Sequence, residues 1–236
     1  MGVRLEVCVD TAEGLAQAVA GGADRIELCA ALAVGGLTPS AGLIALAAKC
    51  GVPVVAMIRP RAGDFVWSEA EVGMMEAEIA SVRAAGLHGV ALGASLPDGR
   101  LDEPVLRRLV AASEGLELVL HRCIDLTPDM DAALEEAVGL GFQRILTSGG
   151  ETTAEAGAGQ IGALVRQAAG RITVMPGSGV NPGNAAMLKG LGIGEIHASC
   201  SASRPASGPV VEMGFAPLVQ RQTSADAVRA LRRALE

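Results

Sequence analysis

The chain has 236 residues, of which half are apolar and 19% are charged, and its formal net charge is −7. These values are typical of a globular protein with a sizeable core, and the negative charge argues against an extended nucleic-acid surface, which would be basic. With one Trp, three Phe and no Tyr, the chain also lacks aromatic platforms for stacking single strands. We therefore expect no nucleic-acid partner.

Short aliphatic runs alternate with longer segments of helical periodicity from one end of the chain to the other. The predicted strands are Val3–Val9, Asp24–Cys29, Pro53–Ile58, Gly89–Gly93, Leu116–His121, Arg144–Thr147, Ile172–Met175 and Glu195–Ala198. The predicted helices lie near residues 11–21, 39–50, 69–85, 103–113, 128–139, 153–169, 182–190 and 224–235. The alternation indicates repeated βα units.

Polar residues in front of several predicted helices suggest where those helices begin. Ser68 with Glu71, and Thr152 with Glu155, have the spacing of a capping box. Three further candidate caps stand directly before a proline, which is favoured at the first helical position: Thr38, Thr127 and Asn181.

Eight βα units in one chain predict a closed (β/α)8 TIM barrel, in which the eight parallel strands form a single domain over residues 1–236. An open doubly wound sheet is the alternative. No GxGxxG turn follows the first strand, which favours the barrel, and we expect no nucleotide cofactor. One long loop, residues 199–223, separates the last strand from the last helix, and a loop of that length is usually functional or an oligomer contact.

The apolar segments are too short or too interrupted to cross a membrane, because a spanning helix needs about 18 or more continuous apolar residues. The longest candidate, residues 43–58, contains Lys49, Gly51 and Pro53. We therefore expect a soluble cytoplasmic protein with no membrane partner. Its five cysteines form no CxxC pair, so reduced thiols are expected and a structural zinc site is not.

One five-residue phrase occurs twice, in the first and second strands. Arg4-Leu5-Glu6-Val7-Cys8 is followed 21 residues later by Arg25-Ile26-Glu27-Leu28-Cys29. Successive side chains of a strand point to opposite faces, so each phrase has one aliphatic face and one face of Arg, Glu and Cys. Because buried charge is costly unless it is paired, these faces predict a polar barrel interior with Glu6 and Glu27 inside it.

The working face of such a barrel is built from the C-terminal ends of the strands and the loops that follow them. Histidine and carboxylate side chains there are suited to proton transfer, and arginines to holding carboxylate or phosphate. Neutralisation of charge inside the barrel is the alternative role. The candidate catalytic residues are Glu6, Glu27, Arg59, Arg61, Asp64, His121, Arg122, Asp125 and His197.

Glycine-rich turns after the sixth and seventh strands are candidate anion sites, because glycine lets backbone N–H groups approach a phosphate. Ordinary tight turns are the alternative. The candidate anion-binding residues are Ser148, Gly149, Gly150, Gly177, Ser178, Gly179 and Ser199.

The thiols of Cys8 and Cys29 should face the same interior near the working face. Soft thiolates select Cu(I), so both residues are candidate metal ligands. The alternative is that each cysteine fills a narrow barrel as a small hydrophobe.

Long ordered motifs in this chain resemble the CutC copper-homeostasis family. They are Arg25–Ala30, Gly35–Ser40, Ile58–Phe65, His121-Arg122 with Asp125, Leu146–Gly150 and Gly177–Val180. The resemblance implies a TIM barrel, a cytoplasmic location, a role in copper handling, copper as a possible ligand and a homodimer. It supports Cys29 best as a copper ligand, and Ile124 departs from the aromatic residue that the family often has there.

Two hypotheses about function follow. The first is a CutC-type copper homeostasis protein that binds Cu(I) through Cys29 and nearby soft ligands. The second is a barrel enzyme that acts on a small anionic or phosphorylated substrate by acid/base chemistry, with Glu27 or His121 as the acid/base group.

Overall fold

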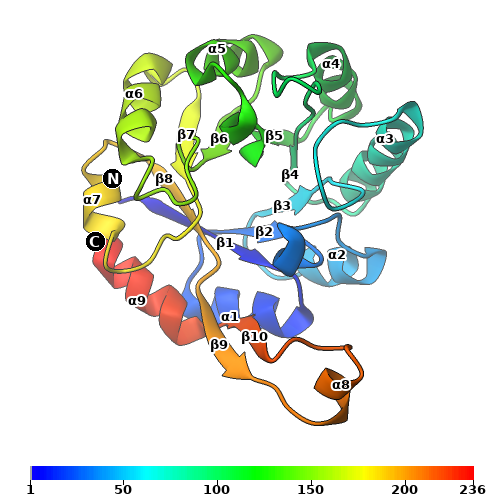
Figure 1. Ribbon diagram of the computed structural model, residues 1–236, viewed down its shortest axis with the longest axis vertical. Helices are drawn as coiled ribbons and strands as arrows, with labels where there is room; N and C mark the ends of the chain where they lie inside the picture. Colours follow the sequence, from blue (N-terminus) through cyan, green and yellow to red (C-terminus); the bar gives the residue numbers. More distant parts are fainter. Residues whose placement is uncertain (1) are drawn as a thin grey trace.

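A computed structural model describes residues 2–236 and shows eight parallel strands arranged as a barrel, with helices around them (Figure 1). The strands are β1 Arg4–Val9, β2 Arg25–Leu28, β3 Val54–Met57, β4 Gly89–Leu92, β5 Glu117–Leu120, β6 Arg144–Thr147, β7 Thr173–Pro176 and β8 Glu195–Ala198. Their order in the sheet is β7-β6-β5-β4-β3-β2-β1-β8, and β7 packs beside β8 at the remaining seam. The predicted (β/α)8 barrel is therefore confirmed.

Except for a short helix at residues 209–212, in the segment predicted as a loop, the helices of the described residues occupy the predicted segments, with shorter bounds. They are α1 Ala12–Gly21, α2 Ala41–Ala47, α3 Glu69–Ala84, α4 Glu103–Ala112, α5 Met130–Leu140, α6 Ala158–Ala168, α7 Ala185–Lys189, α8 Pro209–Glu212 and α9 Ala225–Leu235. Two 3₁₀ turns, η1 Leu32–Val34 and η2 Arg122–Leu126, follow β2 and β5. Each of these turns lies at the C-terminal end of a strand, where a barrel carries its working face.

Several predicted helix starts are wrong. Ser68 caps α3 with Glu71 as a full capping box, as predicted, but α2 is capped by Ser40 and α5 by Asp129. The hydroxyl of Thr38 is used elsewhere, because it donates to Glu78 and accepts from the Arg59 backbone N–H. A side chain that has a tertiary partner is no longer free to cap a helix.

The other three wrong starts lie before α5, α6 and α7. Thr127 donates to the carbonyl of Ile124, and Asn181 accepts from the N–H of Gly183 in a local turn. The cap positions of α6 and α7 are Gly157 and Asn184, so neither Thr152 nor Asn181 has that role.

The segment predicted as a long loop, residues 199–223, contains an antiparallel ribbon. Strand β9, Ser201–Pro205, pairs with β10, Val219–Thr223, and the short helix α8 lies between them. We call residues 201–223 the arm, because it extends away from the barrel beside α1 (Figure 1). Exposed apolar side chains lie between α8 and β10, with Phe215 78% and Leu218 70% exposed.

Alternate side chains of the strands divide the core into an outer and an inner part. Ile26 and Leu28 belong to the outer layer between strands and helices. The inner, lumenal layer has one apolar cluster, formed by Cys29, Val55, Met57, Ala91, Val119, Leu146 and Met175. The rest of the lumen is filled by charged side chains. No helix among the described residues has both the length and the apolar character needed to cross a membrane.

Candidate functional site

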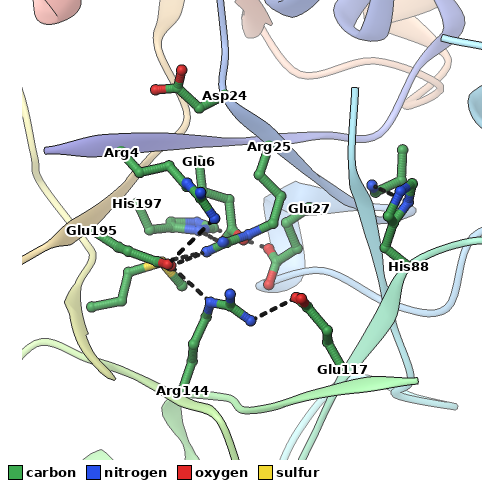
Figure 2. Close-up of polar contacts among 12 residues, drawn as sticks. Arg4, Glu6, Asp24, Arg25, Glu27, His88, Glu117, Arg144, Glu195 and His197 are labelled. Carbon is green, nitrogen blue, oxygen red and sulfur yellow. Dashed lines mark hydrogen bonds and ion pairs between the residues drawn. The ribbon is translucent and has the colours of Figure 1, made fainter. Parts of the chain in front are cut away.

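Charged side chains from strands on different sides of the barrel meet in the lumen, as Figure 2 shows. Arg25 on β2 donates to Glu6 on β1 at 2.5 Å and to Glu195 on β8 at 2.5 Å. Arg144 on β6 donates to the same Glu195 at 2.8 Å and to Glu117 on β5 at 2.7 Å. Only the lumen lets side chains of such separate strands touch, so this face of the repeated phrase points inward, as predicted.

We call Glu6, Arg25, Glu117, Arg144, Glu195 and His197 the lumenal charge network. Its members alternate in sign, which offsets the cost of burying them; Glu117 is the exception, because its side chain is 48% exposed. Burial alone would raise the pKa of Glu6, but the bonds from His197 and Arg25 lower it to about 2. Glu6 is therefore an ionised carboxylate inside the barrel.

A second group, the thiol cluster, consists of Cys8, Glu27, Cys29 and His197. His197 Nδ1 lies 2.7 Å from Glu6 Oε1, which leaves Nε2 directed toward Cys8 and Glu27. One ligand atom from each of Cys8, Glu27 and His197 lies within 4.8 Å of the others. Cys29 Sγ donates to Glu27 Oε2 at 3.4 Å, so the second thiol joins the same group.

Burial dominates the electrostatics of the thiol cluster. Burial, with the nearby Glu27 and Cys8, raises the pKa of the Cys29 thiol well above its usual value. Burial also raises the pKa of Glu27, against the opposing effect of His197. Burial lowers the pKa of His197, but Cys8 and the two glutamates outweigh it and raise that pKa well above the ordinary value. The raised pKa favours the protonated form of the His197 ring, which lies 2.7 Å from the carboxylate of Glu6.

The donor atoms of the thiol cluster suit a soft metal ion. Two thiols and one imidazole nitrogen are ligands that Cu(I) accepts. Glu6 holds the far nitrogen of the His197 ring, which is the usual way an outer carboxylate orients a metal-binding histidine. The residues present therefore fit the copper that the resemblance implies.

Arg59 and His121 lie at the mouth of the barrel, outside the lumenal charge network. Arg59 donates to the carbonyls of Val34, Gly36 and Gly63. His121 accepts from the N–H of Cys123 through Nδ1 at 3.2 Å. Both side chains are buried, and neither touches Glu6 or Glu27 through a described hydrogen bond.

Arg61 and Asp64 brace their own loop and are not part of the lumen. Arg61 bonds Glu71 at 2.5 Å and Asp64 at 2.9 Å, and its guanidinium stacks on Trp67. These are partly exposed contacts among residues 61–71. The prediction that Arg61 grips an anion together with Arg59 and Arg122 is not supported, because its guanidinium already has two carboxylate partners.

The Ser148-Gly149-Gly150 turn does hold an anion, but the anion is the carboxylate of Asp125. Asp125 accepts from the N–H groups of Ser148 and Gly150 at 3.0 and 3.2 Å, and from Thr147 Oγ1 at 2.5 Å. Gly149 N–H donates to Thr147 Oγ1, and Arg122 completes the site by pairing with Asp125 at 2.7 Å. The N–H donors of this turn are thus already used within the protein, and binding of an external anion there stays a prediction.

The second glycine turn is tied to the loop before α6. Ser178 Oγ donates to the carbonyl of Thr152, and the carbonyl of Ser178 accepts from Ala154 N–H. Gly177 N–H bonds Thr147 O, and Gly179 O accepts from Asn184. Ser199 lies apart from this turn, with its hydroxyl 3.1 Å from that of Ser201.

Sequence reasoning missed several members of the site. Arg25, Arg144, Glu117 and Glu195 were not among the candidates, although Arg25 shares the inward face of the repeated phrase with Glu27. The strand period of two did place Arg25 in the lumen, but it does not indicate which acidic side chains Arg25 pairs with. Ser95, buried at the end of β4, has no motif around it.

The buried ring of His121 makes stability depend on pH. Burial, together with the charge of Arg59, lowers its pKa from 6.5 to about 3. The unfolded chain therefore binds a proton at His121 more readily than the folded chain does. The contribution of the neutral ring to the free energy of unfolding is complete above pH 6.5 and is lost as the pH falls toward 3. Between pH 7 and pH 5, the wild type should lose about 2 kcal/mol more unfolding free energy than H121N.

Urea denaturation at several pH values checks this expectation. Asparagine keeps an acceptor for the Cys123 N–H, and the same change at the exposed His88 is the control. Equal pH slopes for the wild type and H121N would show that the His121 ring is not held neutral.

The chain is similar to proteins of one known family over most of its length. The model of the CutC family matches residues 3–202. A CutC family protein of Rhizobium meliloti (strain 1021) is 53% identical over 236 residues, covering 99% of this chain and 96% of that protein. One from Caulobacter vibrioides (strain NA1000 / CB15N) is 51% identical over 238 residues, with 98% and 97% covered.

A solved structure shares the fold as well. The crystal structure of CutC from Streptococcus agalactiae has a TM-score of 0.80 and 32% identity, covering 84% of this chain and 98% of that chain. The match of the family model ends at residue 202, near the start of the arm. The family model and the near full-length relatives show that the chain belongs to the CutC family.

Proposed function

We propose that this protein acts in copper homeostasis by binding Cu(I) at the thiol cluster. The observation that carries the proposal is the convergence of Cys8, Glu27 and His197, whose ligand atoms lie within 4.8 Å of one another, with Cys29 bonded to Glu27. The Streptococcus agalactiae relative carries the name of a copper homeostasis protein. The cluster supplies the soft ligands that such a role needs.

Each residue of the cluster would have a distinct part in holding Cu(I). The sulfurs of Cys8 and Cys29 would supply the soft ligands, and His197 Nε2 would supply the nitrogen. Glu6 would keep the ring in place from the other side. Because thiols and the imidazolium must lose protons before they ligate, binding would release protons.

A competition titration against a Cu(I) chelator under anaerobic conditions tests the proposal. C29S and C8S should each lower the Cu(I) affinity at least about tenfold, since each removes a soft ligand that serine does not replace. C50S is the matched control, because the Cys50 thiol lies outside the cluster and bonds the carbonyl of Val52.

Unchanged affinity in both C8S and C29S would remove the proposal. If C50S loses as much Cu(I) affinity as C29S does, copper binds thiols non-specifically, and this result would also refute the proposal. Circular dichroism of each variant separates a lost ligand from a lost fold.

The second candidate function is an enzyme that uses acid/base chemistry on a small anionic or phosphorylated substrate. One observation favours it. Glu27 has a pKa raised by burial and lies 3.8 Å from His197 Nε2. A carboxyl group with a raised pKa beside an imidazole is suited to accept and return a proton.

We also propose the cytoplasmic location and the homodimer that the family resemblance implies. The exposed apolar side chains of the arm, which include Met213, Phe215 and Leu218, support a contact with a second copy. The mass in solution, measured by light scattering, distinguishes a dimer from a monomer.

A further inference from the structure

Three buried donor atoms at the mouth of the barrel have no hydrogen-bond partner among the described residues. They are Arg59 Nε, Ser95 Oγ and His121 Nε2. Their residues are 5%, 3% and 2% exposed. We call these three residues the donor cluster. Leaving a buried donor unpaired costs about 1–3 kcal/mol, so three in one place need an explanation.

The three residues all contact Phe65, Arg59 and His121 through its ring and Ser95 through its backbone carbonyl. The guanidinium of Arg59 lies 4.9 Å from the centroid of the Phe65 ring, and the ring of His121 lies 4.7 Å from it. Ser95 N–H donates to the carbonyl of Phe65 at 2.8 Å. The residues follow β3, β4 and β5, which are neighbours in the sheet, so their C-terminal ends meet at one part of the rim.

The free nitrogen of His121 is a donor. Its Nδ1 accepts from the backbone N–H of Cys123, so the proton of the neutral ring is on Nε2. Close packing holds the ring, because a Cβ on Gly93 would lie 2.4 Å from His121 Cε1. The nearby positive charge of Arg59 also disfavours a second proton on this ring.

Arg59 differs from the other arginines that were candidates for anion binding. Arg61 and Arg122 pair with acidic side chains, whereas the described partners of Arg59 are three backbone carbonyls. A buried cation without an anion is costly. Three of its five N–H donors bond those carbonyls, and Nε is the buried nitrogen left with no partner, so it can donate to an anion.

We propose that Arg59, Ser95 and His121 form a binding site for the carboxylate group of a small organic acid. One positive charge and two neutral donors balance a carboxylate, whereas a phosphate dianion would keep an excess negative charge in a buried place. The ring of Phe65, which is partly buried and lies against Arg59 and His121, would pack on the carbon part of the ligand. The site follows β3 to β5 and adjoins the thiol cluster at Gly36, which accepts from Arg59 and lies against Cys29 Sγ. It uses none of the residues of the thiol cluster and does not depend on copper binding.

Isothermal titration of the metal-free protein with acetate and with pyruvate tests the site, with sodium chloride at equal ionic strength as the reference. We expect saturable binding of at least one of these carboxylates, and none of inorganic phosphate. S95A should weaken that binding at least about fivefold, since it removes a hydrogen bond to a charged group. H121N should weaken it as well, because asparagine keeps the Cys123 contact but has no donor at the Nε2 position.

Unfolding of the ligand-free variants, together with a second buried serine, provides the control. Ser95 Oγ has no partner, so S95A without ligand should unfold at the wild-type midpoint. Ser113 is equally buried and bonds the carbonyl of Leu109 at 2.7 Å, so S113A should lower the midpoint but leave carboxylate binding unchanged. Absence of carboxylate binding, binding of phosphate alone, or wild-type affinity in both S95A and H121N would each overturn the proposal.

Discussion

Replacing Arg25 by methionine is expected to lower the free energy of unfolding by about 3–5 kcal/mol, because it leaves two buried carboxylates without their shared cation. Arg25 is 2% exposed and bonds both Glu6 and Glu195. Methionine keeps most of the side-chain length, so the loss of unfolding free energy results from removing the charge and not from a large cavity. Urea denaturation at pH 7 measures it.

Arg108 is the matched control on the surface. It also bonds two glutamates, Glu69 and Glu76, but its side chain is 41% exposed. R108M should cost less than about 1 kcal/mol, since water stabilises the carboxylates that remain. Similar losses in R25M and R108M would mean that the lumenal charge network is not a buried ionic structure.

Replacing Asp125 by alanine is expected to destabilise the protein by about 3–5 kcal/mol, because several donors lose their acceptor at once. Asp125 accepts from the N–H groups of Ser148 and Gly150, from the hydroxyl of Thr147, and from Arg122. Its side chain is 6% exposed. Formate should restore part of the stability, since it can occupy the vacated place as a free carboxylate. Thermal unfolding with 0 and about 100 mM formate measures both effects.

The control for this second variant is D226A. Asp226 pairs with Arg229 at the same i, i+3 spacing that Asp125 has with Arg122, but it is 92% exposed. D226A should cost less than about 1 kcal/mol and gain nothing from formate. If formate stabilises D125A no more than D226A, the turn is not an anion site.

The barrel and the direction of its inward face could be predicted because both follow from short-range periodicity. The strand period of two sends Glu6, Glu27, Cys8 and Cys29 to one side, and the structure brings them together there. Predicting the eight βα units needed only the local pattern of each strand and each helix. The family resemblance, which depends on long ordered motifs, is also confirmed.

Partner choice could not be read from sequence. Asp125 and the Gly149-Gly150 turn were both predicted to be site residues. They are more than 20 positions apart, and no local sequence pattern indicates that the carboxylate of Asp125 accepts from the N–H groups of this turn. Arg61 was likewise predicted to bind an anionic ligand. In the structure its guanidinium pairs with Glu71 and Asp64 of the same loop. The arm was predicted as a loop because its strands, such as Ser201–Pro205, lack an alternating apolar pattern.

The way the barrel closes has a consequence for biosynthesis. Strand β1 pairs with β8, and α1 packs against α9, where a Cβ on Gly21 would lie 2.5 Å from Val228. The contact between Glu6 and His197 spans 191 positions. On the ribosome, the first strand therefore keeps an open edge until the last quarter of the chain has emerged. A nascent chain with such an edge is a natural client for chaperones.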